Sequence, residues 1–155
     1  MIKINVITSH SNWFNYIKSP NNYIERKIKK LNLKDKKFYK KNFFCSLLLS
    51  NSKEIKKLNK KFRKKNKNTD VLSFPFYSKE MLKKKLKKEK DIYLGDIIIN
   101  LNKVKGKNRI KTFKVEFDQL WIHGLVHLLG YDHKKNSEFF KMNRIERKYF
   151  KLVNV

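Results

Sequence analysis

The segment over residues 112–133 constrains this chain more than any other part of it. Apolar side chains recur there at helical spacing, at Phe113, Phe117, Leu120, Trp121, Leu125 and Leu128. Gly130 follows the last of them and can adopt the left-handed conformation that commonly ends a helix. Histidines stand at 123, 127 and 133, on both sides of this glycine. The sequence therefore predicts a helix over 112–129 and then a turn, with imidazoles on both.

His123, His127 and His133 have the spacing of a metal site. The first two are four residues apart, so on a helix their side chains leave one face a turn apart and can share one ion. Gly130 then lets the chain turn back and bring His133 to the same ion. Three protein ligands with a fourth position left for water is the catalytic arrangement of zinc. We therefore predict one Zn²⁺ ion on these histidines, and a structural or exposed role for the isolated His10.

The same histidine spacing occurs in zinc peptidases with the motif H-E-x-x-H-x-x-G-x-x-H. In those enzymes the Glu after the first His is the general base. Gly124 occupies that position here and can transfer no proton. The sequence therefore predicts the metal ligands of such an enzyme without its peptidase base, so a different base, or metal-bound hydroxide itself, must serve.

The rest of the chain alternates between strand-like and helix-like segments. Strands are predicted over 2–7, 43–49, 71–74 and 92–99, and helices over 21–32, from a cap at Ser52 to about 66, and from a cap at Ser137 onward. Residues 79–90, nearly all Lys and Glu, predict an exposed helix or a mobile loop. The 155 residues contain only 4 Gly and 2 Pro, which fits one domain over 1–155. The predicted fold is α+β, with about four strands in a mixed sheet and several helices.

Charge restricts the partners of the chain. The net charge is +27, from 40 Lys and Arg against 13 Asp and Glu. Such an excess attracts polyanions, so nucleic acid is the first candidate partner and an anionic membrane surface the second. Most of these residues are lysines in a chain rich in Asn and Ile, as compositional drift in an AT-rich genome produces. The charge therefore favours a nucleic-acid partner without establishing one.

No feature of the sequence indicates export. There is no secretory signal, and no apolar stretch approaches the roughly 20 residues that cross a bilayer. The single cysteine, Cys45, lies in an apolar run and is predicted to be buried and unreactive. We therefore expect a cytoplasmic protein without disulfides.

Three blocks of the sequence resemble motifs of one bacterial family. HGLVHLLGYDH at 123–133 is similar to the H-G-x-L-H-L-x-G-Y-D-H motif of the YbeY family, the rRNA maturation factors and endoribonucleases. LNKKFR at 58–63 with TDVLSFP at 69–75, and LGDI at 94–97, resemble its other blocks in order and spacing. The departures are Val126 for Leu, Phe62 for Tyr, and Gln119 where some members have His. The resemblance covers roughly residues 40–150.

The resemblance implies a zincin-like fold, zinc on the three histidines and cleavage of single-stranded RNA. It further implies maturation of the 3′ end of 16S rRNA, ribosome quality control and association with the ribosome or its small subunit. Arg63 matches the family's functional arginine and is the predicted catalytic residue, because a guanidinium can hold a scissile phosphate bidentately. Asp132 either orients a histidine or stabilises the turn. Asp70 and Ser73 either line the cleft or fix the turn and strand, and Asp96 is predicted to make a structural hydrogen bond.

Two other functions stay open from the sequence. One is an RNA-binding or ribosome-binding assembly factor whose zinc is mainly structural. The other is a peptidase, which Gly124 disfavours. Substitution of His127 separates them, because a nuclease would lose cleavage and keep its affinity for RNA.

Overall fold

The computed structural model describes all 155 residues, and its centre is a four-stranded sheet in the order β1-β2-β4-β3. The strands are β1 (Ile2–Thr8), β2 (Asn42–Ser50), β3 (Val71–Pro75) and β4 (Asp91–Asn100), and the helices are α1 (Pro20–Lys34), α2 (Ser52–Arg63), α3 (Lys79–Lys88), α4 (Ile110–Leu128) and α5 (Asn136–Asn154). β1, β2 and β4 are parallel, whereas the edge strand β3 is antiparallel to β4. The predicted α+β fold with a mixed four-stranded sheet is confirmed.

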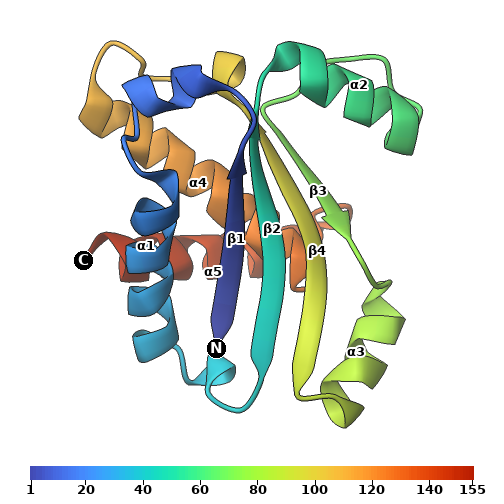
Figure 1. Cartoon of the computed structure of the whole chain (residues 1–155). Helices are drawn as coiled ribbons and strands as arrows, with labels where there is room; N and C mark the ends of the chain where they lie inside the picture. Colours follow the sequence, from blue (N-terminus) through green and yellow to red (C-terminus); the bar gives the residue numbers. More distant parts are fainter.

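One face of the sheet carries the main core. Alternate side chains of β1, β2 and β4 contribute to this core together with α1, α4 and α5; in Figure 1, α4 and α5 lie behind the sheet and α1 lies beside β1. Trp13, Phe113, Phe117 and Trp121 are completely buried in this core. On the other face, α2 covers only the end of the sheet at the top of Figure 1, where Ile55 packs on Leu72 and Ile98.

Several element ends differ from the predicted ones. Asn51, and not Ser52, caps α2, because its side-chain oxygen accepts a hydrogen bond from the Glu54 N–H at 3.0 Å. The helix ends at Arg63, since Lys64 takes the left-handed conformation with φ 55°. α5 begins at Asn136 without a side-chain cap, so the predicted cap at Ser137 was wrong.

The lysine-rich segment forms α3, which begins after a Ser78 cap. Most of its lysines are exposed, but Leu82 is buried in the main core. This helix packs near Gly130, because a Cβ atom on that glycine would lie 3.4 Å from Leu82. None of the helices combines the length and the apolar composition needed to cross a membrane.

Candidate metal centre

α4 lies unusually close to the sheet at Gly124. A Cβ atom at this position would come within 2.6 Å of Ile97 Cγ2 on β4. The Ser73 hydroxyl of β3 donates to the Gly124 carbonyl at 3.5 Å. The residue that follows the first histidine is therefore pressed against the sheet, and there is no room there for the glutamate of a zinc peptidase.

The turn after α4 depends on Gly130, as predicted. Its φ of 89° lies in the left-handed region. The Gly130 N–H donates to the His127 carbonyl at 2.9 Å, and the Tyr131 N–H donates to the Val126 carbonyl at 3.3 Å. These two bonds are those of a Schellman motif, which ends the helix and reverses the chain. The Tyr131 carbonyl is thereby placed 3.1 Å from His127 Nδ1.

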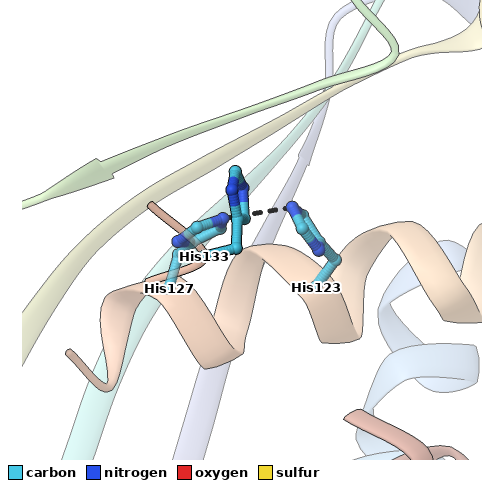
Figure 2. Close-up of side chains that lie close together, drawn as sticks. All are labelled: His123, His127 and His133. Carbon is cyan, nitrogen blue, oxygen red and sulfur yellow. Dashed lines mark hydrogen bonds between the residues drawn. The ribbon is translucent and has the colours of Figure 1, made fainter. Parts of the chain in front are cut away.

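The three histidines converge. Figure 2 shows His123 and His127 rising from α4 while His133 approaches from the segment after the helix. One ring nitrogen from each residue lies within 4.8 Å of the others. The Nε2 atoms of His123 and His127 are only 3.1 Å apart, the contact dashed in Figure 2. The structure therefore brings together all three predicted ligands.

Hydrogen bonds at Nδ1 leave both Nε2 atoms free to bind a metal. His123 Nδ1 lies 2.7 Å from Glu146 Oε1, and His127 Nδ1 faces the Tyr131 carbonyl. Both partners accept hydrogen bonds, so each neutral ring carries its proton on Nδ1 and a lone pair on Nε2. Two lone pairs at 3.1 Å repel unless a cation lies between them. Tetrahedral zinc places its nitrogen ligands about 3.3 Å apart, so the donor set fits this ion.

Burial lowers the pKa of His127, and its neighbours His123 and His133 lower that pKa further. Burial has this effect because it disfavours the charged imidazolium. His127 is therefore neutral at neutral pH, which is the form that binds a metal.

A cavity of about 460 Å³ adjoins the cluster on the side of His123. It lies between the start of β3, α4 and α5, and its polar lining is Asp70, Gln119, His123, Glu146 and Arg147. Leu120, Ile122 and Phe150 contribute apolar walls. The arrangement offers a ligand next to the histidines both a cation and hydrogen-bonding groups.

Comparison with known proteins gives the family. The family model described as Endoribonuclease YbeY matches residues 9–154. This chain belongs to the YbeY family. A Pelagibacter ubique protein named Endoribonuclease YbeY is 44% identical over an alignment of 156 residues, which covers 99% of this chain and 97% of that protein. An Ehrlichia canis protein of the same name is 35% identical over 150 residues, 96% and 90% of the two chains.

A solved structure agrees in fold. The solution structure of a Thermotoga maritima protein matches with a TM-score of 0.54 and 27% identity, covering 99% of this chain and 89% of that one. The YbeY resemblance suggested by three sequence blocks is therefore confirmed. The zincin-like description of the fold stays a prediction.

Arg63 lies outside the cavity of this YbeY-family chain. Its Nη2 donates to the Ser73 carbonyl at 2.6 Å, and its guanidinium carbon is 5.4 Å from the centre of the Phe74 ring. Ser73 in turn contacts Gly124, the neighbour of His123. The structure thus connects Arg63 to the metal centre through β3 and shows no hydrogen bond between Arg63 and the histidines.

The predicted acidic residues have different positions. Asp132 accepts a hydrogen bond from the His133 N–H at 2.7 Å and so stabilises the turn. Asp70 accepts from the Val71 N–H at 2.8 Å and also lines the cavity. Asp96 accepts from the Tyr93 hydroxyl at 2.6 Å, as its predicted structural role requires.

Two residues outside the motif behave as predicted. His10 contacts Asn51 and Glu54 and takes no part in the cluster. Cys45 is buried, and this burial raises the pKa of its thiol to about 12. An un-ionised thiol is unreactive.

Glu146 was missed by sequence reasoning. It lies on α5, 23 residues beyond His123, and its spacing carries no signal. Ligating histidines usually have a carboxylate or carbonyl partner on the other ring nitrogen. That rule predicts that some acceptor exists, but only the docking of α5 on α4 identifies which one.

Proposed function

We propose that this chain is a zinc-dependent endoribonuclease that cleaves single-stranded RNA. One Zn²⁺ ion is held by His123, His127 and His133. Its proposed cellular task is maturation of the 3′ end of 16S rRNA and ribosome quality control, in the cytoplasm and in association with the small subunit. The observation that carries the proposal is the 3.1 Å separation of two Nε2 atoms whose Nδ1 atoms are already hydrogen-bonded.

The metal, the residues that orient its ligands and the adjacent cavity have separate proposed roles. A bound zinc ion supplies Lewis-acid activation of the phosphate or of water. Glu146 and the Tyr131 carbonyl hold the His123 and His127 rings in the orientation that binds it. The cavity beside His123 takes the nucleotide next to the scissile bond.

Two arginines have proposed roles in binding the RNA phosphates and stabilising their charge. Arg147 lines the cavity and offers its guanidinium to the backbone of the bound strand. Arg63 is the proposed catalytic arginine, in agreement with the family motif, and stabilises charge that develops on the phosphate. Its link through Ser73 to Gly124 supports this role, because the same segment of β3 touches both the arginine and the ligand helix.

The composition of the cluster favours catalysis over a structural metal. Only the three histidines contribute to it, and no thiol or carboxylate joins them. Structural zinc sites usually have four protein ligands, whereas three leave a position for water or substrate. His133 is exposed, so solvent and RNA reach the centre.

The test is incubation of the purified protein with an RNA precursor that contains the 3′ end of 16S rRNA, followed by mapping of the fragment ends. We expect cleavage that a chelator abolishes and zinc restores. His127→Ala should lose cleavage and retain RNA affinity, and His10→Ala, a histidine outside the cluster, should match the wild type. Cleavage by the His127→Ala protein as fast as by the wild type would contradict the proposal, because the cleavage would then not depend on the metal centre.

The assembly-factor alternative predicts another result. If zinc is mainly structural, His127→Ala unfolds the protein, and the wild type binds RNA without cutting it at any zinc concentration. Circular dichroism of both proteins distinguishes these cases. Casein in the same assay tests the peptidase function, which the contact of Gly124 with Ile97 disfavours.

A further inference from the structure

Half of one sheet face has no helix over it. In Figure 1 this face points toward the viewer, with α4 and α5 behind it and α2 near the upper end. The strand register places Lys3, Phe44 and Tyr93 side by side across β1, β2 and β4. Phe76, just past the end of β3, continues this line, with its ring centre 5.5 Å from that of Tyr93. We name these four residues the aromatic row.

The aromatic row is accessible to solvent. Phe44 and Tyr93 are half-buried, and Phe76 is 64% exposed. Lys3 Nζ lies 6.0 Å from the centre of the Phe44 ring. Exposed aromatic rings with a cation at one end are unusual on a surface that contacts only water. Removal of such rings from water lowers the free energy, so their exposure indicates a binding surface.

A second group of the same kind lies where α2 meets β3. The ring of Phe62, which is 59% exposed, is 5.6 Å from that of Phe74. Lys61 Nζ is 5.2 Å from the Phe62 ring, and the Arg63 guanidinium is 5.4 Å from the Phe74 ring. We name Lys61, Phe62, Arg63 and Phe74 the arginine cluster.

The chemistry of both groups favours a nucleic acid strand. Bases stack on aromatic rings while neighbouring cations pair with the phosphates, and four-stranded sheets with exposed rings are known platforms for single-stranded RNA. The centres of protein interfaces are instead depleted of lysine. The two β4 carboxylates on this part of the face already have partners, because Asp96 accepts from the Tyr93 hydroxyl at 2.6 Å and Asp91 accepts from the Asn42 side-chain amide at 2.7 Å.

Strand β3 connects these rings to the metal centre. Ser73 points to α4, where it contacts Gly124, whereas Phe74 lies on the opposite face with Ile98 and Leu72. A strand of RNA that passes over this edge therefore meets rings on one side and the histidine cluster on the other.

We propose that the aromatic row and the arginine cluster form a stacking platform for single-stranded RNA, which leads over the edge strand β3 toward the metal centre. The proposal rests on the proposed function in taking the bound strand to be the substrate. It adds the aromatic row as a binding surface away from the cleavage site, with Phe76 as its most accessible ring, whereas the arginine cluster contains the proposed catalytic Arg63.

The first test compares two exposed phenylalanines. Phe76→Ala removes a ring from the platform, and Phe140→Ala removes a ring that is 71% exposed on α5. The full chain is titrated into a fluorescent single-stranded RNA at fixed salt, with chelator present so that nothing is cleaved. We expect Phe76→Ala to weaken binding about 10-fold, the scale of one stacked base, and Phe140→Ala to leave it unchanged. Equal affinities of the two variants would overturn the proposal.

The second test detects stacking directly. Both native tryptophans, Trp13 and Trp121, are completely buried. Phe76→Trp therefore adds the only exposed indole, and RNA should quench its fluorescence as it binds. Phe140→Trp should show no quenching. The same response in both variants, or quenching by concentration-dependent self-association without RNA, would contradict the platform.

These tests separate the two proposals. Zinc-dependent cleavage by the wild type, together with identical RNA binding by Phe76→Ala, overturns the platform and leaves the proposed function intact. Binding that depends on Phe76, in a chain that never cleaves RNA, supports the platform and overturns the nuclease.

Discussion

The helical pair of histidines and the third histidine are held in different ways. His123 and His127 are half-buried on α4, and a hydrogen bond at Nδ1 orients each ring. His133 is exposed, and the bond near it joins its backbone N–H to Asp132 rather than its ring. The first two ligands are therefore oriented before metal binds, whereas the third is positioned only through its turn. Substitutions around each histidine should reveal this difference.

Loss of the Glu146 carboxylate should have the largest effect. Glu146→Ala frees the His123 ring, and we expect zinc affinity to fall about 10–100-fold, as for other partners of metal-binding histidines. Competition with a chromophoric chelator measures the change. Glu146→Gln, which keeps an acceptor oxygen, should lose less, and the exposed Glu80→Ala should lose nothing. Unchanged affinity in Glu146→Ala would mean that α4 alone orients the pair.

Substitution of Gly130 should have the next largest effect. Gly130→Ala forces a residue with a Cβ atom to a φ of 89°, which costs roughly 1–2 kcal/mol of unfolding free energy. The Schellman turn and the Tyr131 carbonyl also shift, so zinc affinity should fall with stability. Urea unfolding of the metal-free chain measures the first loss. Gly130→Asn should be milder, because Asn tolerates the left-handed region; equal losses in both variants would point to a steric cause.

Loss of the hydrogen bond that holds the His133 backbone should have a smaller effect on zinc affinity. Asp132→Ala removes one hydrogen bond to the His133 N–H, which is worth roughly 0.5–1.5 kcal/mol. We therefore expect zinc affinity to fall only about 2–10-fold. Asp132→Asn keeps the acceptor and should bind zinc like the wild type. A loss as large as that of Glu146→Ala would show that the third ligand is oriented as strictly as the pair.

The smallest expected effect is the change in stability that accompanies protonation of His127 in the metal-free protein. Its pKa is lowered by burial, so the unfolded chain takes up this proton at a higher pH than the folded chain does. Stability should therefore fall as the pH drops below about 6.5, the ordinary value, and stop falling once the folded-state pKa is passed. NMR of the imidazole protons across this range checks the shift. An ordinary pKa would mean that His127 is hydrated before metal binds.

The sequence predicts those features that depend only on residues close together along the chain. The spacing of His123 and His127 on a helix, and the left-handed turn at Gly130, involve only neighbouring residues and were predictable. The strands were predictable for the same reason, because alternation and apolar runs are local patterns. Their order in the sheet depends on long-range pairing and was not predicted.

The features that sequence reasoning missed come from tertiary contacts. Glu146 reaches His123 only because α5 packs on α4. Asn51 rather than Ser52 caps α2, which a one-residue shift in a polar run cannot reveal. In the sequence, Gly124 indicates only that the peptidase base is absent, and the structure adds that its small size lets the ligand helix approach Ile97.

X-ray absorption at the zinc edge of the purified, zinc-loaded protein tests the central claim most directly. We expect one ion per chain, bound to three imidazole nitrogens and one oxygen from solvent, with the imidazole signal lost in His127→Ala. A fourth ligand from the protein, or a zinc environment unchanged in that variant, would contradict an open three-histidine centre.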